Sequence, residues 1–179
     1  MRLADFIRRD MSSILREWEA FAATLVPAAR HMDAPALRDH AQQILNAVIK
    51  DLSTPQTRHA QRQKSLGRSP RLPDAPETAA QTHALLRARH GFNINQMVSE
   101  YRALRASVLR LWIDDGHPGP SDFDDMVRFN EAIDQAVTES VGISMRRSSR
   151  RATCCSACWG TTCAARCRPS RPPLNTWPR

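Results

Sequence analysis

Residues 93–116, NINQMVSEYRALRASVLRLWIDDG, decide the fold. Asn93 is followed three residues later by Gln96, which is the spacing of a capping box at the start of a helix. Apolar side chains then recur every three or four residues, and Gly116 ends the pattern. The segment therefore predicts one amphipathic helix, with a buried stripe of Ile94, Val98, Tyr101, Leu104 or Arg105, Val108, Leu111 and Trp112.

The segments on either side repeat the helical period. Helices are predicted over residues 2–26, from Asp33 to Leu52, from a capping box at Asp74–Glu77 to Gly91, and from Ser121 to about Val141. Residues 53–75 form the chief predicted loop, with a short helix around 56–66. No segment alternates with the period of a strand. The predicted fold class is therefore all-α, a single bundle of about five main helices.

The net charge lies at the C-terminal end of the chain. The 26 Lys and Arg exceed the 18 Asp and Glu by a formal charge of +8. Residues 146–179 contain eight arginines and no acidic residue, so residues 1–145 carry no net charge. All five cysteines also lie in this Arg/Cys-rich segment. Its prolines, its like charges and its few large apolar groups predict a disordered C-terminal tail.

Three ordinary functions fit the Arg/Cys-rich segment poorly. A zinc site needs two well-formed ligand pairs, and Cys155/Cys158 is the one pair with good spacing. A disulfide framework is disfavoured because the cysteine count is odd and residues 1–145 contain no cysteine. A nucleic-acid-binding arm is disfavoured because the segment lacks Lys and its aromatic residues are Trp159 and Trp177.

A shifted reading frame explains the composition of this segment better. In the shifted frame, each new codon consists of the third base of one codon and the first two bases of the next. The codons of residues 154–155 then encode Leu whatever their third bases are, and those of residues 158–160 encode Leu followed by Gly. The other junctions permit the string D-M-L-L-G-V-L-G-H-D-L-R-G-P-L. That string is similar to the H-box of sensor histidine kinases, in which the His receives phosphate from ATP. We interpret residues 146–179 as an out-of-frame remnant of a kinase dimerisation and H-box region.

Residues 95–108, NQMVSEYRALRASV, resemble a helix typical of the RsbRD-type N-terminal sensory domain. The resemblance covers about residues 2–142 and includes four further motifs, at residues 15–19, 37–41, 54–56 and 129–134. This family heads RsbT co-antagonist proteins of the stressosome and many bacterial sensor histidine kinases. The resemblance implies a globin-like all-α sensory fold, usually without haem and often dimeric. In kinase members the last helix continues into the dimerisation helix that bears the H-box.

The resemblance and the shifted frame together predict the domain organisation and the function. Residues 1–145 are expected to form an RsbRD-like all-α sensory domain, followed by the out-of-frame segment 146–179. The predicted function is signal transduction, as the sensory domain of a bacterial two-component sensor histidine kinase truncated before the kinase core. The alternative is a stand-alone module, either a stressosome-like scaffold or a haem-binding globin-like sensor.

Three histidines raise the question of a bound haem. His83, His40 and His31 lie on or beside predicted helices, and globin-like folds bind haem through a helical His. A lone helical His without further ligand context is more simply a surface or capping residue. We therefore expect no cofactor and no metal, and we keep His83 as a candidate ligand-binding residue.

A second set of candidate ligand-binding residues lies within the fold-deciding segment. Glu100, Tyr101, Arg102 and Arg105 are spaced to form a polar ligand pocket. Arg and Glu at these intervals are also typical of a solvated helix face. Trp18 and Trp112 lie on apolar faces of their helices and are expected in the core.

The chain as written is not expected to be an enzyme. It has no Gly-rich phosphate-binding loop and no Ser or Cys beside a recognisable base. The parent protein would be a histidine kinase that acts on a response regulator. The longest apolar stretch, residues 20–29, contains Thr24 and Pro27, so no membrane insertion is expected. The prediction is a cytoplasmic homodimer without a nucleic-acid partner.

The last predicted helix is expected to transmit the signal. Met126, Ile133 and Val137 follow intervals of seven and four residues, which suits a continuous helix packed on the bundle or on a partner copy. A small rotation or shift of this helix would reposition the phosphoacceptor His of the parent kinase.

The gene sequence tests the shifted-frame interpretation. A single-base correction near codon 143 should open a long reading frame that contains an H-box and ATP-binding motifs. A stop codon shortly downstream in the corrected frame would contradict a kinase parent.

Overall fold

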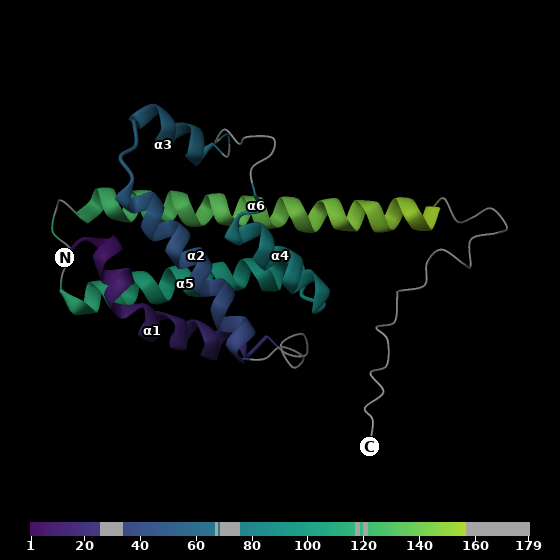
Figure 1. Ribbon diagram of the computed structural model, residues 1–179, viewed down its shortest axis with the longest axis horizontal. Helices are drawn as coiled ribbons and strands as arrows, with labels where there is room; N and C mark the ends of the chain where they lie inside the picture. Colours follow the sequence, from purple (N-terminus) through teal and green to yellow (C-terminus); the bar gives the residue numbers. More distant parts are fainter. Residues whose placement is uncertain (26–33, 67, 69–75, 117–118, 120–121, 157–179) are drawn as a thin grey trace, which may run out of the picture. The chain divides into compact units, whose positions relative to one another are not determined.

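Six α-helices make up most of the described part of the chain (Figure 1). A computed structural model describes every residue except 26–33, 67, 69–75, 117–118, 120–121 and 157–179. The helices are α1 (Leu3–Ala22), α2 (Ala34–Ser53), α3 (Arg58–Ser65), α4 (Ala79–Arg89), α5 (Ile94–Asp115) and α6 (Phe123–Ser156).

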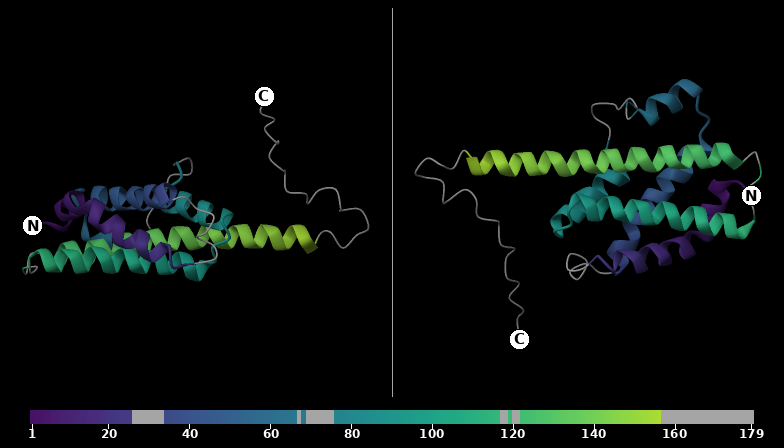
Figure 2. Two further views of the ribbon diagram at one scale, coloured as in Figure 1. Left: turned by 90° about the horizontal axis from the view of Figure 1, so that it is seen from below. Right: turned by 180° about the vertical axis from the view of Figure 1, so that it is seen from behind.

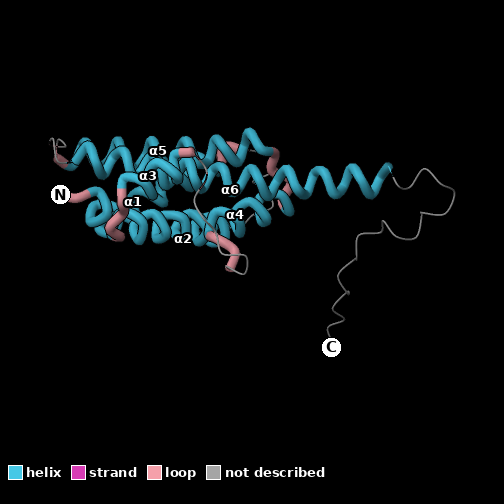
Figure 3. Tube along the Cα trace, turned by 90° about the horizontal axis from the view of Figure 1, so that it is seen from above, coloured by secondary structure: helices cyan, strands magenta, loops and turns pink. Residues whose placement is uncertain are grey.

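The chain divides into two compact units, Met1–Ser144 and Met145–Arg179. In the first unit α1 packs against α2 and α5, and α2 also packs against α4. Two further views show α5 beside the part of α6 that belongs to this unit (Figure 2). No strand occurs in the described ranges (Figure 3), and the predicted all-α helical bundle is confirmed. Within the same ranges, every helix is too short or too polar to cross a lipid bilayer.

The core of the first unit is built from the apolar stripes of its helices. In α1 the buried side chains fall into two groups, residues 3–7 and 14–22, and the helix kinks between them at Asp10 (φ −101°, ψ 16°). Trp18 and Trp112 are both buried, which confirms their predicted place in the core. Each large apolar side chain that is fully buried contributes about 1.5–3 kcal/mol to the hydrophobic stabilisation.

The fold-deciding helix α5 begins and ends as predicted. The Asn93 side chain accepts a hydrogen bond from the Gln96 backbone N–H at 2.9 Å, and the Gln96 side chain accepts one from the Asn93 N–H at 2.9 Å. Gly116 follows the last helical residue as its C-cap. These two reciprocal bonds satisfy backbone donors that the first turn of a helix leaves unpaired.

Helix α4 begins later than predicted. Its capping box is formed by Thr78 and Gln81, and the expected start at Asp74–Glu77 is wrong, because residues 76–78 are not helical. Both pairs have capping-box spacing, so the pattern alone does not choose between them. The hydroxyl of Thr78 also donates to Glu139 of α6 at 2.5 Å, and this tertiary contact favours the later start.

Helix α6 ends later than predicted. It was expected to stop near Val141, and its backbone stays helical to Ser156. Residues 143–156 contain neither Pro nor Gly, and their four Arg residues and Ala152 favour a helix. The helix therefore includes residues 146–156 of the Arg/Cys-rich segment. The rest of the predicted disordered tail, 157–179, and the predicted N-cap Ser121 lie outside the described residues.

The first turn of α1 is capped by a side chain from α6. Arg2, the N-cap residue of α1, makes no side-chain capping bond. Asp125 instead accepts hydrogen bonds from the Leu3 backbone N–H at 3.0 Å and from Arg2 Nε at 2.7 Å. Burial raises the pKa of Asp125, but the bonds from Arg2 and Leu3 outweigh it, so this pKa lies below its ordinary value. The carboxylate therefore stays ionised and holds the start of α1 against α6.

Replacing Asp125 by Ala should lower the free energy of unfolding by about 2 kcal/mol, because the buried N–H of Leu3 loses its acceptor. The pairing with the exposed Arg2 side chain adds little to this loss. Urea denaturation at neutral pH measures the change. Asp124→Ala removes a charge from the same turn at an exposed position, and should cost only about 0.5 kcal/mol. Equal losses in the two variants would contradict the capping role of Asp125.

Candidate functional site

A carboxylate lies in the apolar core of the first unit. Glu100 is on the inward face of α5, within one helical turn of the buried residues Met97 and Leu104, and is only 1% exposed. The helical period aims all three side chains in the same direction. An isolated ionised carboxylate in such surroundings would cost several kcal/mol, so Glu100 requires compensating partners.

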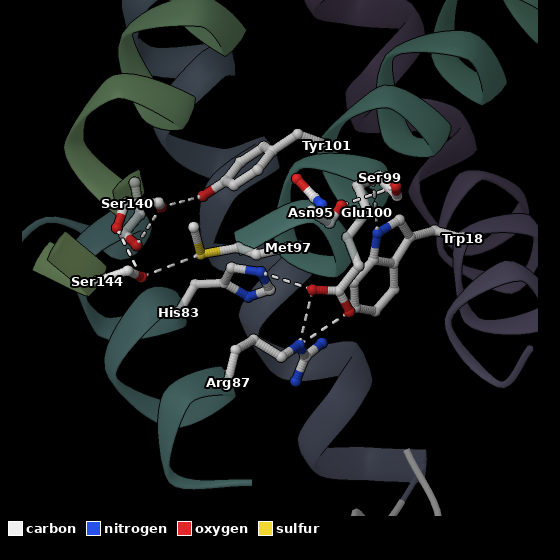
Figure 4. Close-up of polar contacts among 11 residues, drawn as sticks. Trp18, His83, Arg87, Asn95, Met97, Ser99, Glu100, Tyr101, Ser140 and Ser144 are labelled. Atoms are coloured by element: carbon white, nitrogen blue, oxygen red, sulfur yellow. Dashed lines mark hydrogen bonds and ion pairs between the residues drawn. The ribbon is translucent and has the colours of Figure 1, made fainter. Parts of the chain in front are cut away.

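Two side chains of α4 provide this compensation (Figure 4). Arg87 Nε lies 2.8 Å from each carboxylate oxygen of Glu100, and His83 Nε2 lies 3.1 Å from Oε2. Both residues are 1% exposed. They stand four residues apart in the chain, which brings them to the same face of α4. We refer to His83, Arg87 and Glu100 as the Glu100 cluster.

Aromatic rings enclose the Glu100 cluster. The guanidinium of Arg87 lies 5.5 Å from the ring centre of Trp18 and 5.0 Å from that of Phe92. The indole N–H of Trp18 donates to the backbone carbonyl of Glu100 at 3.2 Å. The His83 ring meets the Tyr101 ring edge-on at 5.5 Å. These rings exclude water and favour the cation of Arg87 through their negative faces.

The electrostatics of the cluster favour an ionised Glu100 beside a neutral His83. Burial raises the pKa of Glu100, but hydrogen bonds and charge from His83 and Arg87 together bring it below its ordinary value. Burial lowers the pKa of His83 more than Glu100 raises it. A neutral His83 donates its Nε2 proton to Glu100, and its Nδ1 atom has no hydrogen-bond partner among the described residues. Arg87 and Glu100 then balance each other in charge.

A hydrogen-bond path leads from the residue beside Glu100 to α6. The Ser140 hydroxyl donates to the backbone carbonyl of Ala80 at 2.7 Å. Because its one proton is used there, Ser140 accepts from the Tyr101 hydroxyl at 2.9 Å. Burial raises the pKa of Tyr101, which keeps that hydroxyl protonated. We refer to Tyr101, Ser140 and Ala80 as the Tyr101 relay. It joins α5, α6 and α4.

The space beside the cluster is closed. The crevice between His83, Glu100, Trp18 and Ile44 is too narrow to admit a water molecule. The cluster holds a balanced pair of charges, the Arg87 guanidinium and the Glu100 carboxylate. Among the residues that the structure describes, no group of three or more His, Cys, Asp or Glu side chains could hold a metal ion.

The structure brings together only part of the predicted ligand-binding set. His83, Glu100 and Tyr101 meet in the core, whereas Arg102 is exposed and Arg105 forms an ion pair with Asp134 of α6. Arg102 is two residues from Glu100, so it points to a different side of α5. Arg102 and Arg105 line a surface groove with Phe21 and Leu109, and Glu100 and Tyr101 are not among the residues that line it.

His83 is not the surface or capping residue that the sequence suggested. Its ring is buried and bonded to Glu100, and the ring of His40 lies 6.4 Å away. His31 lies outside the described residues. Sequence reasoning missed Arg87 and Ser140. The spacing of His83 and Arg87, one turn apart on the same helix face, was the available signal for Arg87.

The predicted signal-transmitting positions of α6 face the bundle. Ile133 is fully buried, and Met126 and Val137 are partly buried against the core cluster. The interval of seven residues between Met126 and Ile133 corresponds to about two helical turns, which keeps both on the same side.

Comparison with known proteins identifies one family. The family described as the RsbT co-antagonist protein rsbRD N-terminal domain matches residues 12–153. No curated protein and no solved structure matches the chain.

Protonation of His83 should couple the stability of the domain to pH. The folded state keeps His83 neutral, whereas the unfolded chain binds a proton below about pH 6.5. The free energy of unfolding should therefore fall as pH drops from 7 to 5, by at most about 1.4 kcal/mol per pH unit for this one proton. The contribution of Glu100 is lost only at lower pH, as pH falls through its depressed pKa. Urea denaturation at several pH values measures the slope.

His83→Gln should flatten this dependence between pH 7 and 5, since Gln does not titrate. His59→Gln, at an exposed position of α3, is the matched control and should keep the wild-type slope. A wild-type slope in His83→Gln would contradict a neutral, buried His83.

Proposed function

Because the chain belongs to the RsbRD N-terminal domain family, a family of non-catalytic sensory domains, we propose that it is the input domain of a bacterial sensor histidine kinase. In this proposal the Glu100 cluster responds to the signal, and the Tyr101 relay passes the response to α6. The observation that carries the proposal is the hydrogen-bond path from the core of the bundle to α6.

The Glu100 cluster is suited to switching because its charges are buried. Separating Glu100 from Arg87 would leave an uncompensated charge in the core, which typically costs about 3–5 kcal/mol. Intermediate positions of α4 against α5 are therefore unfavourable. The helices would move between discrete arrangements, as packed cores do.

Helix α6 is the element that would receive this movement. Tyr101 follows Glu100 directly in α5, so a shift of this helical turn displaces the Tyr101 hydroxyl from Ser140. The ion pair of Arg105 with Asp134 joins the same two helices about two turns of α6 earlier. Ile133, which directly precedes Asp134 and is fully buried, would transmit a rotation of α6 through packing.

The kinase assignment rests on residues 146–179. Their shifted reading frame permits an H-box at the place where kinase members of the family continue into the dimerisation helix. The parent protein would be a cytoplasmic kinase that phosphorylates itself and then a response regulator.

A homodimer is part of this proposal, because histidine kinases of this kind pair through the helix that bears the H-box. A surface groove on α1 and α5 supports a second copy as the partner. Small side chains of α5, Ala103 and Ala106, lie there beside Leu109 and Phe21, and Arg102 and Arg105 line the same groove. Small residues allow two helices to approach closely.

The family description favours one alternative, a scaffold of the stressosome type. RsbRD family domains take part in stressosome assemblies. A scaffold would function without a kinase core, so the corrected gene sequence separates the two functions.

The Tyr101 relay can be tested in the frame-restored kinase by a double-mutant cycle. Glu100→Gln should change the autophosphorylation rate by about fivefold or more, because it removes the charge that Arg87 compensates. In a Tyr101→Phe background, Glu100→Gln should change the activation free energy of autophosphorylation by less than half as much. The reason is that the hydroxyl that connects Tyr101 to α6 is then absent. Tyr101→Phe is a better probe of signal transmission to α6 than Ile133→Asp, because Ile133→Asp would bury a charge in the core and unfold the domain.

Thr138→Ala is the matched control background for this cycle. It removes a hydroxyl from the exposed side of α6 and should leave the effect of Glu100→Gln unchanged. Circular dichroism melting verifies that each variant is folded. An unchanged effect of Glu100→Gln in Tyr101→Phe would contradict the relay.

A further inference from the structure

A second feature, a pocket of about 160 Å³, lies between α2, α3, α4 and α6. Its floor is apolar and consists largely of alanine and aliphatic side chains, among them Ala136 of α6 and Ile44 of α2. An engineered apolar cavity of about 150 Å³ accommodates benzene, so this volume suits an apolar group of roughly six to eight non-hydrogen atoms. The pocket is separate from the closed crevice beside the Glu100 cluster, although Ile44 lines both.

The polar groups of this pocket are mainly acceptors. Glu139 accepts hydrogen bonds from Thr78 Oγ1 at 2.5 Å and from Gln135 Nε2 at 2.8 Å. Asp51 accepts one from Gln56 at 2.7 Å and forms an ion pair with Lys64. Two further acceptors, Asp51 Oδ2 and Gln135 Oε1, are buried and have no hydrogen-bond partner among the described residues. The buried donor Lys64 Nζ has no hydrogen bond there either, but it is already paired with Asp51 as an ion pair. Buried acceptors are normally satisfied, so an occupant of the pocket should bring N–H or O–H donors.

The charge of the pocket selects among such occupants. Two carboxylates, those of Asp51 and Glu139, face one ammonium group, that of Lys64. The lining therefore carries a single net negative charge, which favours a cation and disfavours an anion. We propose that this pocket binds a small organic cation, a primary amine attached to a compact apolar body.

Helix α3 provides a way into the pocket. None of its residues is buried. Its side-chain contacts to the rest of the unit include the ion pair of Lys64 with Asp51 and the hydrogen bond of Ser65 to Glu131 at 2.6 Å. Displacing α3 would expose little apolar surface, so its movement costs little hydrophobic energy.

An occupant would act on the same helices as the Tyr101 relay. Ala80 lines the pocket, and its carbonyl accepts the hydrogen bond from Ser140. Glu139 precedes Ser140 in α6. The role of this amine as the sensed signal rests on the proposed sensory function, whereas its binding does not.

Isothermal titration calorimetry of the full chain with benzylamine, benzyl alcohol and benzoate tests the proposal without any kinase. Benzylamine is a cation at neutral pH and should bind about tenfold or more tightly than benzyl alcohol, which has the same shape but no charge. Benzoate should not bind. Failure of benzylamine to bind, or equal binding of the alcohol or the carboxylate, would overturn the assignment.

Variants locate the binding to this pocket. Glu139→Gln should weaken benzylamine binding by about tenfold, and Ala136→Leu should abolish it by filling the floor. Asp124→Asn removes a carboxylate charge at an exposed position of the same helix outside the pocket lining and should alter the affinity less than about twofold. Thermal unfolding verifies that the variants are folded. Wild-type affinity in either Glu139→Gln or Ala136→Leu would overturn the proposal, whatever the outcome of the kinase experiments.

Discussion

The burial of one carboxylate, that of Glu100, is the constraint on which the rest of the helical domain depends. A charge in the core is tolerated only with a partner, so α4 must present Arg87 and His83 toward α5. The buried residues of α4 are otherwise small or polar: Ala80, Gln81 and Ala84. The attachment of α4 therefore rests on directional polar contacts more than on apolar packing. Such contacts specify one position of the helix, because a small displacement breaks them.

Helix α6 is held to the bundle by polar contacts of the same directional kind. Asp125 caps α1, Arg128 donates to backbone carbonyls at the end of α2, and Ser140 connects Tyr101 with α4. These contacts are spaced along the part of α6 that belongs to the first unit. In our proposal, a change at the Glu100 cluster or in the pocket lined by Asp51 and Glu139 would reach α6 through these few bonds. This arrangement fits the sensory role that we propose for the domain.

Most of the helices could be predicted from local patterns, but the candidate site could be predicted only in part. Asn93 and Gln96 opened α5 as expected, because a capping box involves residues within one turn. The start of α4 was misplaced because two capping pairs competed and a contact with Glu139 favoured Thr78. The sequence grouped Glu100 and Tyr101 with Arg102 and Arg105, whereas the structure buries the first two and leaves Arg102 exposed. Arg87 was missed because its partner lies on another helix.

The sequence by itself determined the helical class, the amphipathic faces and the segregation of charge into residues 146–179. These properties follow from the spacing of residues along the chain, which local steric and hydrogen-bonding rules translate into structure. Only the tertiary structure decided that the carboxylate of Glu100 is buried, that His83 is neutral beside it, and that Tyr101 reaches Ser140. Burial and pKa depend on which helix covers a given face. That choice is made by packing between segments far apart in the chain, where no short sequence pattern operates.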